Sequence, residues 1–405
     1  MPAPSPSDIS LKDSVNDDVQ IRVLKTLPEL EEIRDCWESW GGNRDSQIDS
    51  YLSVLQSRPD ILRPHVIVLY RRGRPETILV GRVDRRRLDF KVGYARLRPK
   101  ATVIYFVYGG LRGSTSYENS LAVVNEICRS LARGEADAAY LNFLPTGSHI
   151  YELAKKIPAF LTRDHVVDIQ QHYSASLPNS AEGFYKGLSP NTRWQARSKQ
   201  KKLVRDLSGA VRIRCFRDSG EIDDLIQDVE QVAHKSYQRG LKVGFVDSAE
   251  TRRRLELKAE KAWLRAYVLY IADQPSAFWI GDLNDGIFGS EYLGYDQALG
   301  RYSPGMYLIT KVIEGFCAEE PQRVKEVDFA TGHAQYKEAL GNRQWQEGAL
   351  YIFAPSVRGL FLNGCRNITG RVSHVLKQSL GQTALLQRVK KFWRKAARQR
   401  AMSEA

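Results

Sequence analysis

Apolar runs alternate with amphipathic stretches along the first 170 residues, and this pattern predicts a regular succession of strands and helices. Strands are expected where apolar or β-branched residues form short runs between turn residues. Helices are expected where apolar residues recur every three or four positions, as Leu121, Val124, Ile127 and Leu131 do. The expected strands are 19–24, 65–70, 77–83, 101–108, 138–144 and 162–170, and the expected helices are 28–40, 45–58, 117–133 and 147–156.

The same order of elements returns between residues 190 and 355. A helix opens it, with Ser189 as the expected N-cap and Pro190 in the first turn. The further expected strands are 211–216, 266–271, 276–282, 287–294, 324–329 and 345–353, and the further expected helices are 220–238, 248–263, 303–319 and 334–340. Both halves read β-α-α-β-β-β-α-β-α-β. This predicts a mixed α/β fold with two similar domains in tandem, each a mixed, split β-sheet flanked by helices.

The pattern also predicts where the domains begin and end. Residues 1–18 are polar and are expected to be disordered. The first domain is expected at 19–170 and the second at 190–355, with a linker at 171–189 between them. Residues 356–405 are expected to form basic amphipathic helices.

The composition restricts the class of protein. With 42% hydrophobic and 26% charged residues among 405, the chain is expected to bury real cores, which excludes a wholly disordered or collagen-like protein. No window approaches 18 consecutive apolar residues and the first twenty residues contain no apolar run, so neither a membrane-spanning helix nor a secretory signal is expected. The five cysteines lie far apart without a C-x-x-C pair, which argues against disulfides or a zinc site and favours a cytoplasmic protein.

Positive charge is concentrated in two segments of a chain whose formal net charge is +13. Residues 193–214 contain eight Lys or Arg against Asp206, and residues 366–405 contain ten against Glu404, so the rest of the chain is slightly acidic. Such segments bind acidic lipid headgroups, nucleic acid or a phosphorylated ligand, or they form a solvated helix face. The sequence alone leaves these four interpretations open.

The last basic segment is also amphipathic. Leu385, Leu386, Val389, Phe392 and Trp393 are interleaved with Lys and Arg. A basic helix with this pattern can lie in the interface of an anionic membrane. Besides a cytoplasmic location, we therefore expect peripheral contact with the inner face of a membrane through this tail.

A loop and a helix start in the second half form the first candidate site. Free backbone N–H groups at a helix N-terminus attract phosphate, and Gly305 lets a ligand approach the backbone. Coenzyme A carries a pyrophosphate that such a turn could hold, although a plain Ser-Pro helix start explains the same residues. The candidate donor-binding residues are Arg301, Tyr302, Ser303, Pro304, Gly305, Met306 and Tyr307.

A second candidate site follows at the end of the next expected strand. Asp328 ends this strand, Gly332 turns the chain, and Tyr336 and Lys337 begin a short helix. Polar groups at the carboxyl end of a strand, beside a split sheet, are well placed to line a cleft. The alternative is that Asp328 caps a loop and Lys337 points into solvent.

These stretches resemble a known family. Three elements follow one another in its order and spacing: Gly294-Tyr295-Asp296, then Ser303-Pro304-Gly305-Met306-Tyr307-Leu308, then Asp328-Phe329-Ala330-Thr331-Gly332 through Tyr336-Lys337. They resemble the CelD-like acetyltransferases associated with bacterial cellulose and exopolysaccharide biosynthesis, which are relatives of the GNAT acyltransferases. The resemblance is clear over about 180–355 and weaker over 20–170, and the order of elements in both halves is that of the GNAT fold. The paired halves also resemble the Fem-type peptidoglycan aminoacyltransferases.

The resemblance implies transfer of an acyl group from acetyl-CoA, or another acyl-CoA, to an amine or hydroxyl of a small-molecule or saccharide acceptor. GNAT enzymes use direct attack by the acceptor, without a nucleophilic residue, and no metal is expected. A base must remove the acceptor's proton, an acid must protonate the leaving thiolate, and a cation can stabilise developing negative charge. The candidate bases are Glu291, Asp328 and His333, the candidate acids are Tyr302, Tyr307 and Tyr336, and the candidate cation is Lys337.

Two other functions stay open at this point. Fem-like aminoacyl transfer would use a charged tRNA as donor, and the basic helix 190–207 would then contact RNA phosphates. That helix contains Trp194 as its only aromatic residue, so nucleic acid is the less favoured partner. A non-catalytic scaffold at the membrane is the third possibility. We expect the donor in the second half and the acceptor in a cleft between the halves.

Overall fold

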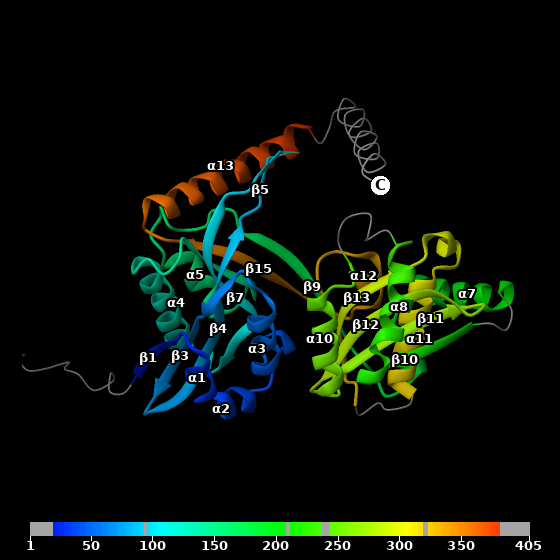
Figure 1. Ribbon diagram of the computed structural model, residues 1–405. Coiled ribbons are helices and arrows are strands. Elements are labelled where there is room, and N and C mark those ends of the chain that lie inside the picture. Colours follow the sequence, from blue (N-terminus) through cyan, green and yellow to red (C-terminus); the bar gives the residue numbers. More distant parts are fainter. Residues whose placement is uncertain (1–18, 93–94, 208–210, 237–243, 319–322, 381–405) are drawn as a thin grey trace, which may run out of the picture.

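The computed structural model describes residues 19–92, 95–207, 211–236, 244–318 and 323–380. It has a mixed α/β architecture with one large mixed sheet flanked by helices, so the predicted fold class is confirmed. Figure 1 shows two lobes joined by two long strands, β9 and β15. The expected disorder of residues 1–18 and the expected tail helix around 385–393 lie outside the described residues.

The first lobe contains the elements up to α5, together with β15 and α13 from the end of the chain. Its strands are β1 (Val19–Leu24), β2 (Ile61–Pro64), β3 (Val66–Arg71), β4 (Arg74–Arg87), β5 (Phe90–Val92), β6 (Ala95–Leu97), β7 (Lys100–Gly113), β8 (Ala138–Pro145) and β15 (Arg343–Phe353). Its helices are α1 (Leu27–Glu31), α2 (Arg34–Ser39), η1 (Arg44–Ser46), α3 (Ile48–Ser57), α4 (Tyr117–Ala132), α5 (His149–Lys156) and α13 (Val357–Leu380).

The second lobe contains the elements from β9 to α12. Its strands are β9 (Asp168–Ser176), β10 (Val211–Phe216), β11 (Leu264–Ile271), β12 (Gln274–Asn284), β13 (Ile287–Tyr295) and β14 (Glu326–Thr331). Its helices are α6 (Ala181–Gly187), α7 (Pro190–Asp206), η2 (Ser219–Glu221), α8 (Ile222–Ala233), α10 (Ala249–Glu260), η3 (Gln297–Tyr302), α11 (Pro304–Ala318) and α12 (Gln335–Leu340).

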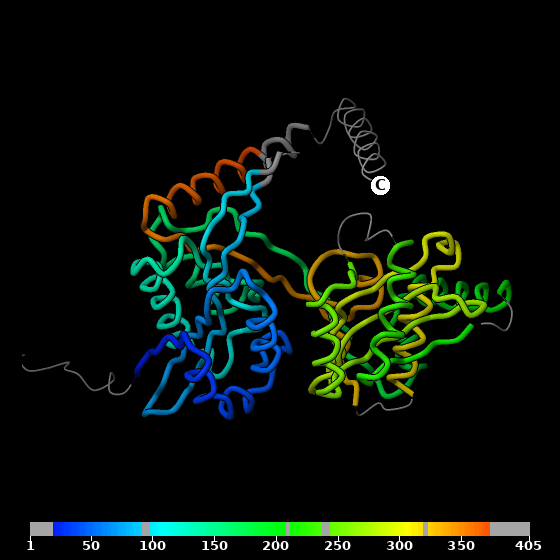
Figure 2. Tube along the Cα trace, viewed as in Figure 1, coloured from blue at the N-terminus to red at the C-terminus, as the bar shows by residue number. Residues whose placement is uncertain are grey.

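Two strands are exchanged between the lobes. β9 follows α5 of the first lobe in the chain, yet it pairs with β14 of the second lobe. β15 follows all the strands of the second lobe, yet it pairs with β8 of the first lobe. Because β9 and β15 also pair with each other, the strands form one continuous sheet in the order β1-β3-β4-β7-β8-β15-β9-β14-β13-β12-β11-β10, with β2 beside β4. The green and orange tubes of β9 and β15 cross the space between the lobes in Figure 2.

The sequence prediction is wrong in detail around this exchange. The strand expected at 162–170 begins only at Asp168 and continues to Ser176, into the stretch expected as a linker. Most of the remaining linker, up to residue 189, is occupied by α6. Residues 171–176 are polar enough to resemble a linker, and their strand conformation depends on the neighbouring strands β14 and β15. The division into domains at 19–170 and 190–355 stays a prediction about how the chain folds.

Apolar clusters cover both faces of the sheet in each lobe. In the first lobe, α4 and α5 pack on one face and α1 to α3 on the other. The exchanged strands belong to the cores that they join: Leu350 and Ile352 of β15 are buried in the first lobe, and Tyr173 and Ala175 of β9 are buried in the second. Each exchanged strand therefore contributes apolar burial, as well as backbone hydrogen bonds, to the other lobe.

α13 follows β15 and lies along the outside of the first lobe beside β5, across the top of the molecule in Figure 1. Its buried side consists of residues such as Leu362, Asn363 and Thr369. Among the described helices, none combines the length and the apolar composition that crossing a membrane would require.

Candidate active site

The two parallel strands of the second lobe separate soon after they meet. β13 pairs with β14 over Ile287–Gly289, and Gly289 lies opposite Asp328 in the last pair. Just beyond, Ser290 and Tyr292 lie opposite consecutive residues of β12, so that Glu291 is the extra residue of a β-bulge. A bulge bends its strand, and β13 therefore diverges from β14 and opens the sheet at this point.

At the end of β13 the chain turns into α11, where the sequence predicts the donor site. Asp296 is the N-cap of η3, and its side chain accepts a hydrogen bond from the N–H of Ala298 at 2.9 Å. Ser303 then takes a left-handed conformation with a φ of 52°, and Pro304 begins the helix. A Cβ on Gly305 would lie 3.2 Å from the Tyr295 ring, so this position leaves little room for a side chain.

The basic helix α7 packs beside this helix start. The ammonium group of Lys199 donates a hydrogen bond to Ser303 Oγ at 2.8 Å. The ammonium group of Lys202 lies 5.6 Å from the centre of the Tyr302 ring, and the guanidinium group of Arg301 lies 4.6 Å from it. One of the two basic segments thus brings positive charge to the N-terminus of α11, a combination that attracts phosphate.

A row of polar side chains crosses the sheet at the junction of the lobes. His172 of β9 is 1% exposed, and its Nε2 lies 2.7 Å from Oδ1 of Asp328 on β14. On its other side, His172 Nδ1 lies 3.3 Å from Oε2 of Glu347 on β15 and 3.2 Å from the hydroxyl of Tyr108 on β7. The Trp345 ring stacks on the imidazole with their centres 4.2 Å apart. These side chains come from four strands and from both lobes.

The two carboxylates hold His172 in its charged form. Burial opposes the charge, but the hydrogen bonds with Asp328 and Glu347 outweigh it and raise the pKa of His172 to about 9. Burial likewise opposes ionisation of Asp328, while the bond from His172 holds the pKa of this carboxyl below its usual value. Asp328 keeps 24% of its side chain exposed, whereas His172 is closed off from solvent. Asp328 is therefore the charged member of this cluster, named here the His172 cluster, that a ligand can reach.

Glu291 lies in a second buried network with three basic groups. It forms ion pairs with Lys258 and with Arg254, the latter at 3.0 Å, and Arg44 Nη2 of the first lobe lies 3.9 Å away. Burial would raise the pKa of Glu291, but these cations lower it strongly. Arg44 also pairs with the buried Asp282 of β12. A carboxylate held by three cations is a weak base, and its contacts indicate that it joins the lobes.

The remaining predicted catalytic residues lie in and after the loop that follows β14. Tyr336 packs edge-on against Phe329 with the ring centres 5.9 Å apart, and burial raises the pKa of its hydroxyl to about 12. Lys337 donates hydrogen bonds to the carbonyl oxygens of Ala330 and Thr331, and burial lowers its pKa to about 8. His333 is 68% exposed and pairs with Glu338, so the structure does not bring it into the His172 cluster.

The corresponding positions of the first lobe are apolar. β7 pairs with β8 in parallel over Val103–Phe106, opposite Ala138–Leu141, so that Phe106 and Leu141 hold the places of Gly289 and Asp328. Both are buried. In the second lobe the space beside Gly289 is taken by the side chains of Asp282 and Arg44, so the first lobe contributes single residues, such as Arg44 and Tyr108, to the candidate site of the second.

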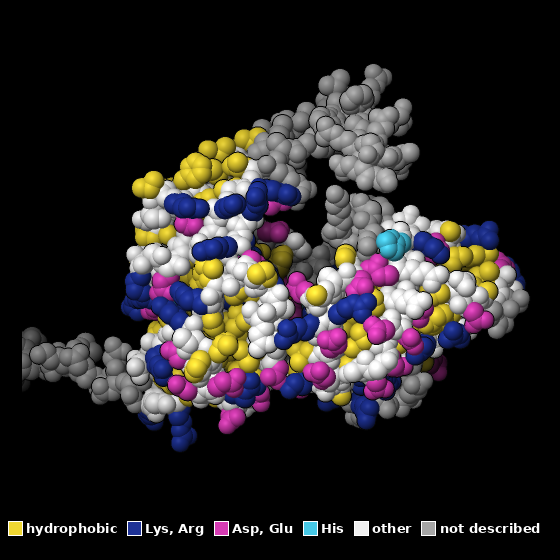
Figure 3. Space-filling model, viewed as in Figure 1, with side chains coloured by type: hydrophobic (Ala, Val, Ile, Leu, Met, Phe, Trp, Pro, Cys, Tyr) yellow, Lys and Arg dark blue, Asp and Glu magenta, His cyan; other side chains and the backbone are white. Residues whose placement is uncertain are grey.

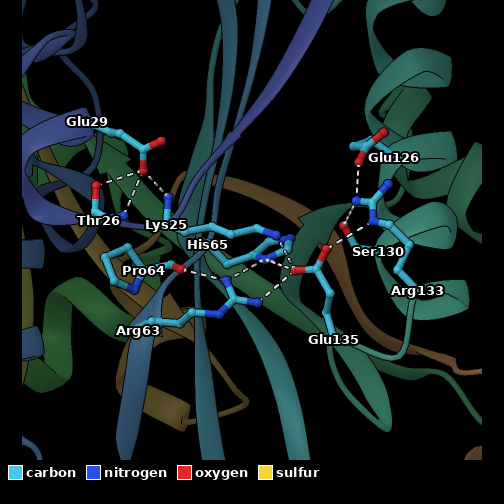
Figure 4. Close-up of polar contacts among 10 residues, drawn as sticks. All are labelled: Lys25, Thr26, Glu29, Arg63, Pro64, His65, Glu126, Ser130, Arg133 and Glu135. Atoms are coloured by element: carbon cyan, nitrogen blue, oxygen red, sulfur yellow. Dashed lines mark hydrogen bonds and ion pairs between the residues drawn. The ribbon is translucent and has the colours of Figure 1, made fainter.

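The first lobe has a charged cluster of its own, drawn in Figure 4, around Glu135. Lys25 and Arg63 reach one carboxylate oxygen of Glu135 at 3.0 and 2.7 Å, and Arg133 reaches the other at 3.1 Å. Burial opposes ionisation, but the hydrogen bonds from Lys25 and Arg63 lower the pKa of Glu135 to about 2. The cluster ties β1, β2 and the end of α4 together, and its ionic groups satisfy one another, which is typical of a structural role.

Several residues of the site were missed by the sequence reasoning. His172 fell in the expected linker, and Tyr108, Glu347 and Lys258 lie in elements that the candidate motifs do not include. Alternation along β15 places Trp345 and Glu347 on one face, a signal that the sequence does contain. Nothing in the sequence pairs them with His172, because that contact depends on the strand exchange.

Within the described ranges, no group of three or more His, Cys, Asp or Glu is arranged to hold a metal ion. The cysteines in these ranges are all free thiols.

Comparison with known proteins bears first on the second lobe. Residues 190–338 match the family model of the acetyltransferase (GNAT) domain. This range includes α7, the opening between β13 and β14, the start of α11 and most of α12. No curated protein matches this chain in sequence. The narrower resemblance to the cellulose-associated CelD-like family is tested by none of these findings and stays a prediction.

Solved structures extend the comparison to both lobes. The structure of FemX is 8% identical, with a TM-score of 0.51 over 80% of this chain and 96% of that one. A tandem GNAT protein from the clavulanic acid biosynthesis pathway is 12% identical, with a TM-score of 0.45 over 83% of this chain and 99% of that one. At such identities the likeness to FemX is one of fold. Residues 190–338 of the second lobe are therefore similar to the acetyltransferase (GNAT) domain family, within a chain whose overall fold is like that of FemX.

Proposed function

We propose that this protein transfers an acyl group from an acyl-CoA, with acetyl-CoA as the simplest donor, to an amine or hydroxyl of an acceptor bound between the lobes. One observation carries the proposal. The opening between β13 and β14 has a helix start with an adjacent lysine, Lys199, beyond the end of β13, and a reachable carboxylate, Asp328, at the point where the strands separate. The match to the GNAT domain family over the same residues supports it.

The donor would bind with its pyrophosphate at residues 301–307. Backbone N–H groups in the first turn of α11 would donate to phosphate oxygens, and the helix dipole would favour the negative charge. Lys199 would exchange its bond with Ser303 for a charge-assisted bond to phosphate. Gly305 is buried against the Tyr295 ring, so a larger residue there would displace the helix start.

The acceptor would lie next to Asp328. Its nitrogen or oxygen attacks the thioester carbon, the C–S bond breaks, and the acceptor's proton passes to the Asp328 carboxylate. Tyr336 is a phenol at neutral pH and is our candidate to protonate the thiolate of coenzyme A. Lys337 stands beside the Asp328 loop as the candidate cation for developing charge.

In this proposal His172 is a positioning residue. Both of its nitrogens are engaged, one with Asp328 and the other with Glu347 and Tyr108. It therefore fixes the orientation of the Asp328 carboxylate and holds its charge without touching the reacting atoms. We assign no part in the reaction to His333, which is exposed, or to Glu291, which is neutralised by Lys258 and Arg254.

The test is calorimetric titration of the full chain with coenzyme A and with acetyl-CoA. Lys199→Glu should weaken binding by about tenfold or more, because an attraction becomes a repulsion at the phosphate. Lys201→Glu, the same change at an exposed position on the same helix, is the matched control and should leave the affinity within about twofold. Gly305→Glu should abolish binding, with folding checked by circular dichroism.

The outcomes separate the proposed donors. Binding that is lost in Lys199→Glu and kept in Lys201→Glu would justify screening acceptors by release of free thiol. If the folded wild-type chain binds neither ligand, acyl-CoA is not the donor. The same titration with an aminoacylated tRNA then tests the Fem-like alternative. The cellulose and exopolysaccharide connection, and membrane contact through the basic tail beyond residue 380, stay predictions from the sequence.

A further inference from the structure

α13 has two faces that differ in what they contact. Its inner face packs on the first lobe, where Leu362 and Asn363 are buried and Arg366 forms an ion pair with the buried Asp164 at 2.8 Å. Asn363 also donates hydrogen bonds to the carbonyl oxygens of Leu161 and Arg163. These contacts fix the rotation of the helix about its axis, so the residues on the opposite side must face outward.

The outer face of α13 is apolar. It includes Val357, Leu360, Phe361, Ile368 and Val372, which helical periodicity places on one side of the helix together with Gly364 and Arg371. Their exposed fractions include 90% for Val357, 62% for Phe361 and 64% for Ile368. On a helix exposed to water, the outer face would be expected to carry polar residues. This row of apolar side chains, named here the stripe, therefore indicates a surface that a partner covers.

Two further exposed apolar residues lie on the loop that precedes β9. Phe160 and Leu161 are 68% and 65% exposed. Their loop is held against α13 by the bond from Asn363 to the carbonyl oxygen of Leu161 at 2.7 Å. Figure 3 shows the hydrophobic side chains gathered along α13 at the upper left, with a row of Lys and Arg directly below them. Apolar and basic surface therefore adjoin on this side of the molecule.

The charges along α13 are of one sign. Residues 357–372 contain Arg358, Arg366 and Arg371 and no Asp or Glu. Arg366 is bound to Asp164, whereas Arg371 is exposed and Arg358 is 60% exposed beside Asp137. The end of α5 adds the exposed Lys156 near the same loop, where Arg163 donates to its carbonyl oxygen. Lys156 pairs with Glu152 at 3.2 Å, as Arg358 does with Asp137 and Arg366 with Asp164, so Arg371 supplies the net positive charge beside the stripe.

We infer that the outer face of α13 binds the surface of an anionic lipid bilayer, with the helix lying in the plane of the interface. Apolar side chains would enter the boundary between headgroups and acyl chains, and the arginines and lysine would pair with lipid phosphates. A second copy of the chain fits less well, because a twofold contact through this face would bring the two Arg371 side chains into it, and residues 357–372 offer no Asp or Glu to pair with them. The lipid surface satisfies both the apolar stripe and its charge.

The test measures binding of the full chain to vesicles of mixed phosphatidylglycerol and phosphatidylcholine by flotation. The double variant Phe361→Asp/Ile368→Asp should reduce the partition coefficient by about tenfold or more, because two charges replace apolar groups at the lipid boundary. Both side chains point outward, so the fold should be unchanged. Leu27→Asp, at a 45% exposed residue of α1, is the matched control and should bind as the wild type does.

A charge variant tests whether positive charge contributes to lipid binding. Arg371→Glu should lower binding to the anionic vesicles by several-fold and make it less dependent on salt, while pure phosphatidylcholine vesicles should bind all variants weakly.

Two results would overturn the inference. One is equal vesicle binding by the wild type and Phe361→Asp/Ile368→Asp, since the basic tail beyond residue 380 would then account for all of it. The other is a wild-type chain that does not float with anionic vesicles at low salt. If light scattering shows a wild-type dimer that the double variant dissociates, without any vesicle binding, the outer face is an interface between copies instead.

Discussion

At the scale of single residues, the ionic partners of each buried group decide which side chains of the candidate site are charged and which can act as a base. His172 has a carboxylate on each side, so it stays protonated despite being closed off from water. Glu291 has the reverse surroundings, one carboxylate among several cations. In the sequence Asp328 and Glu291 look equally suited to be a base, but their surroundings differ. Asp328 is partly exposed and has one ionic partner, His172, whereas Glu291 is enclosed among cations.

The first prediction concerns the pH dependence of stability. The pKa of His172 is raised from 6.5 to about 9, so the stabilisation from its charged form is fully present below pH 6.5 and is lost as the pH rises through about 9. Urea unfolding should show this loss in the wild type. In His172→Gln the stability should change less over the same range. Parallel curves for the two proteins would mean that His172 is not charged in the folded chain.

The second prediction separates a structural from a catalytic Glu291. Glu291→Gln removes the partner of Lys258 and Arg254 in a buried place, so the free energy of unfolding should fall by about 3–5 kcal/mol. Glu260→Gln, on an exposed residue of α10, should change it by less than about 0.5 kcal/mol. A Glu291→Gln chain with unchanged stability but no acyltransfer would contradict our assignment and make Glu291 the base.

At the scale of elements, the molecule depends on the crossing of β9 and β15. β15 enters the first lobe beside α5, where Gly348 lies against the ring of Tyr151 so closely that a Cβ would overlap it. The exchange also builds the site, because β9 brings His172 next to β14, and β15 brings Trp345 and Glu347 next to His172. One strand pair thus supports two cores and one polar cluster.

The third prediction tests this crossing. Gly348→Val should lower the free energy of unfolding by about 1–3 kcal/mol, because the added side chain must displace Tyr151. Hydrogen exchange should become faster in α5 and β8, although the substitution lies late in the chain. Gly147→Val adds the same side chain just before α5 in open space and should leave α5 protected. Faster exchange in the second lobe alone would argue against the observed pairing of β15.

At the scale of the whole molecule, the lobes are joined by more than the two strands. Arg44 of η1 pairs with Asp282 of β12, and Lys261 pairs with Asp49 of α3. An open cavity of about 760 Å³ lies between α3 and α10. The lobes therefore contact each other through polar side chains that surround an open cavity. The β-sheet, in contrast, runs without interruption from one lobe to the other.

The fourth prediction follows from the shared sheet. A chain that ends at Gly341 lacks β15 and α13, so β8 is left as an unpaired edge and the first lobe loses Leu350 and Ile352 from its core. We expect its first lobe to be unfolded or aggregated, by hydrogen exchange and near-ultraviolet circular dichroism. A chain that ends at Leu380 retains both elements and should keep the first lobe folded. A protected β8 in the shorter chain would mean that the first lobe folds without the exchanged strand.

The sequence predicted the elements well where a short stretch determines them. The strand expected at 138–144 is β8, and the one expected at 345–353 is β15 with two further residues at its start. The residues predicted to bind the donor, 301–307, also lie together, because they are neighbours in the chain and a proline at a helix start is a local signal. The match of residues 190–338 to the GNAT domain agrees with the order of elements read there.

What the sequence by itself determined is the set of strands and helices, the mixed α/β class and the loop at the start of α11. These depend on backbone preferences and hydrophobic periodicity over a few residues. Only the tertiary structure decided that β9 and β15 change lobes, and with that which residues meet at His172. Tyr108, Asp328 and Glu347 lie far from one another along the chain, and they meet because strand edges pair across the whole sheet, a choice that no local pattern contains.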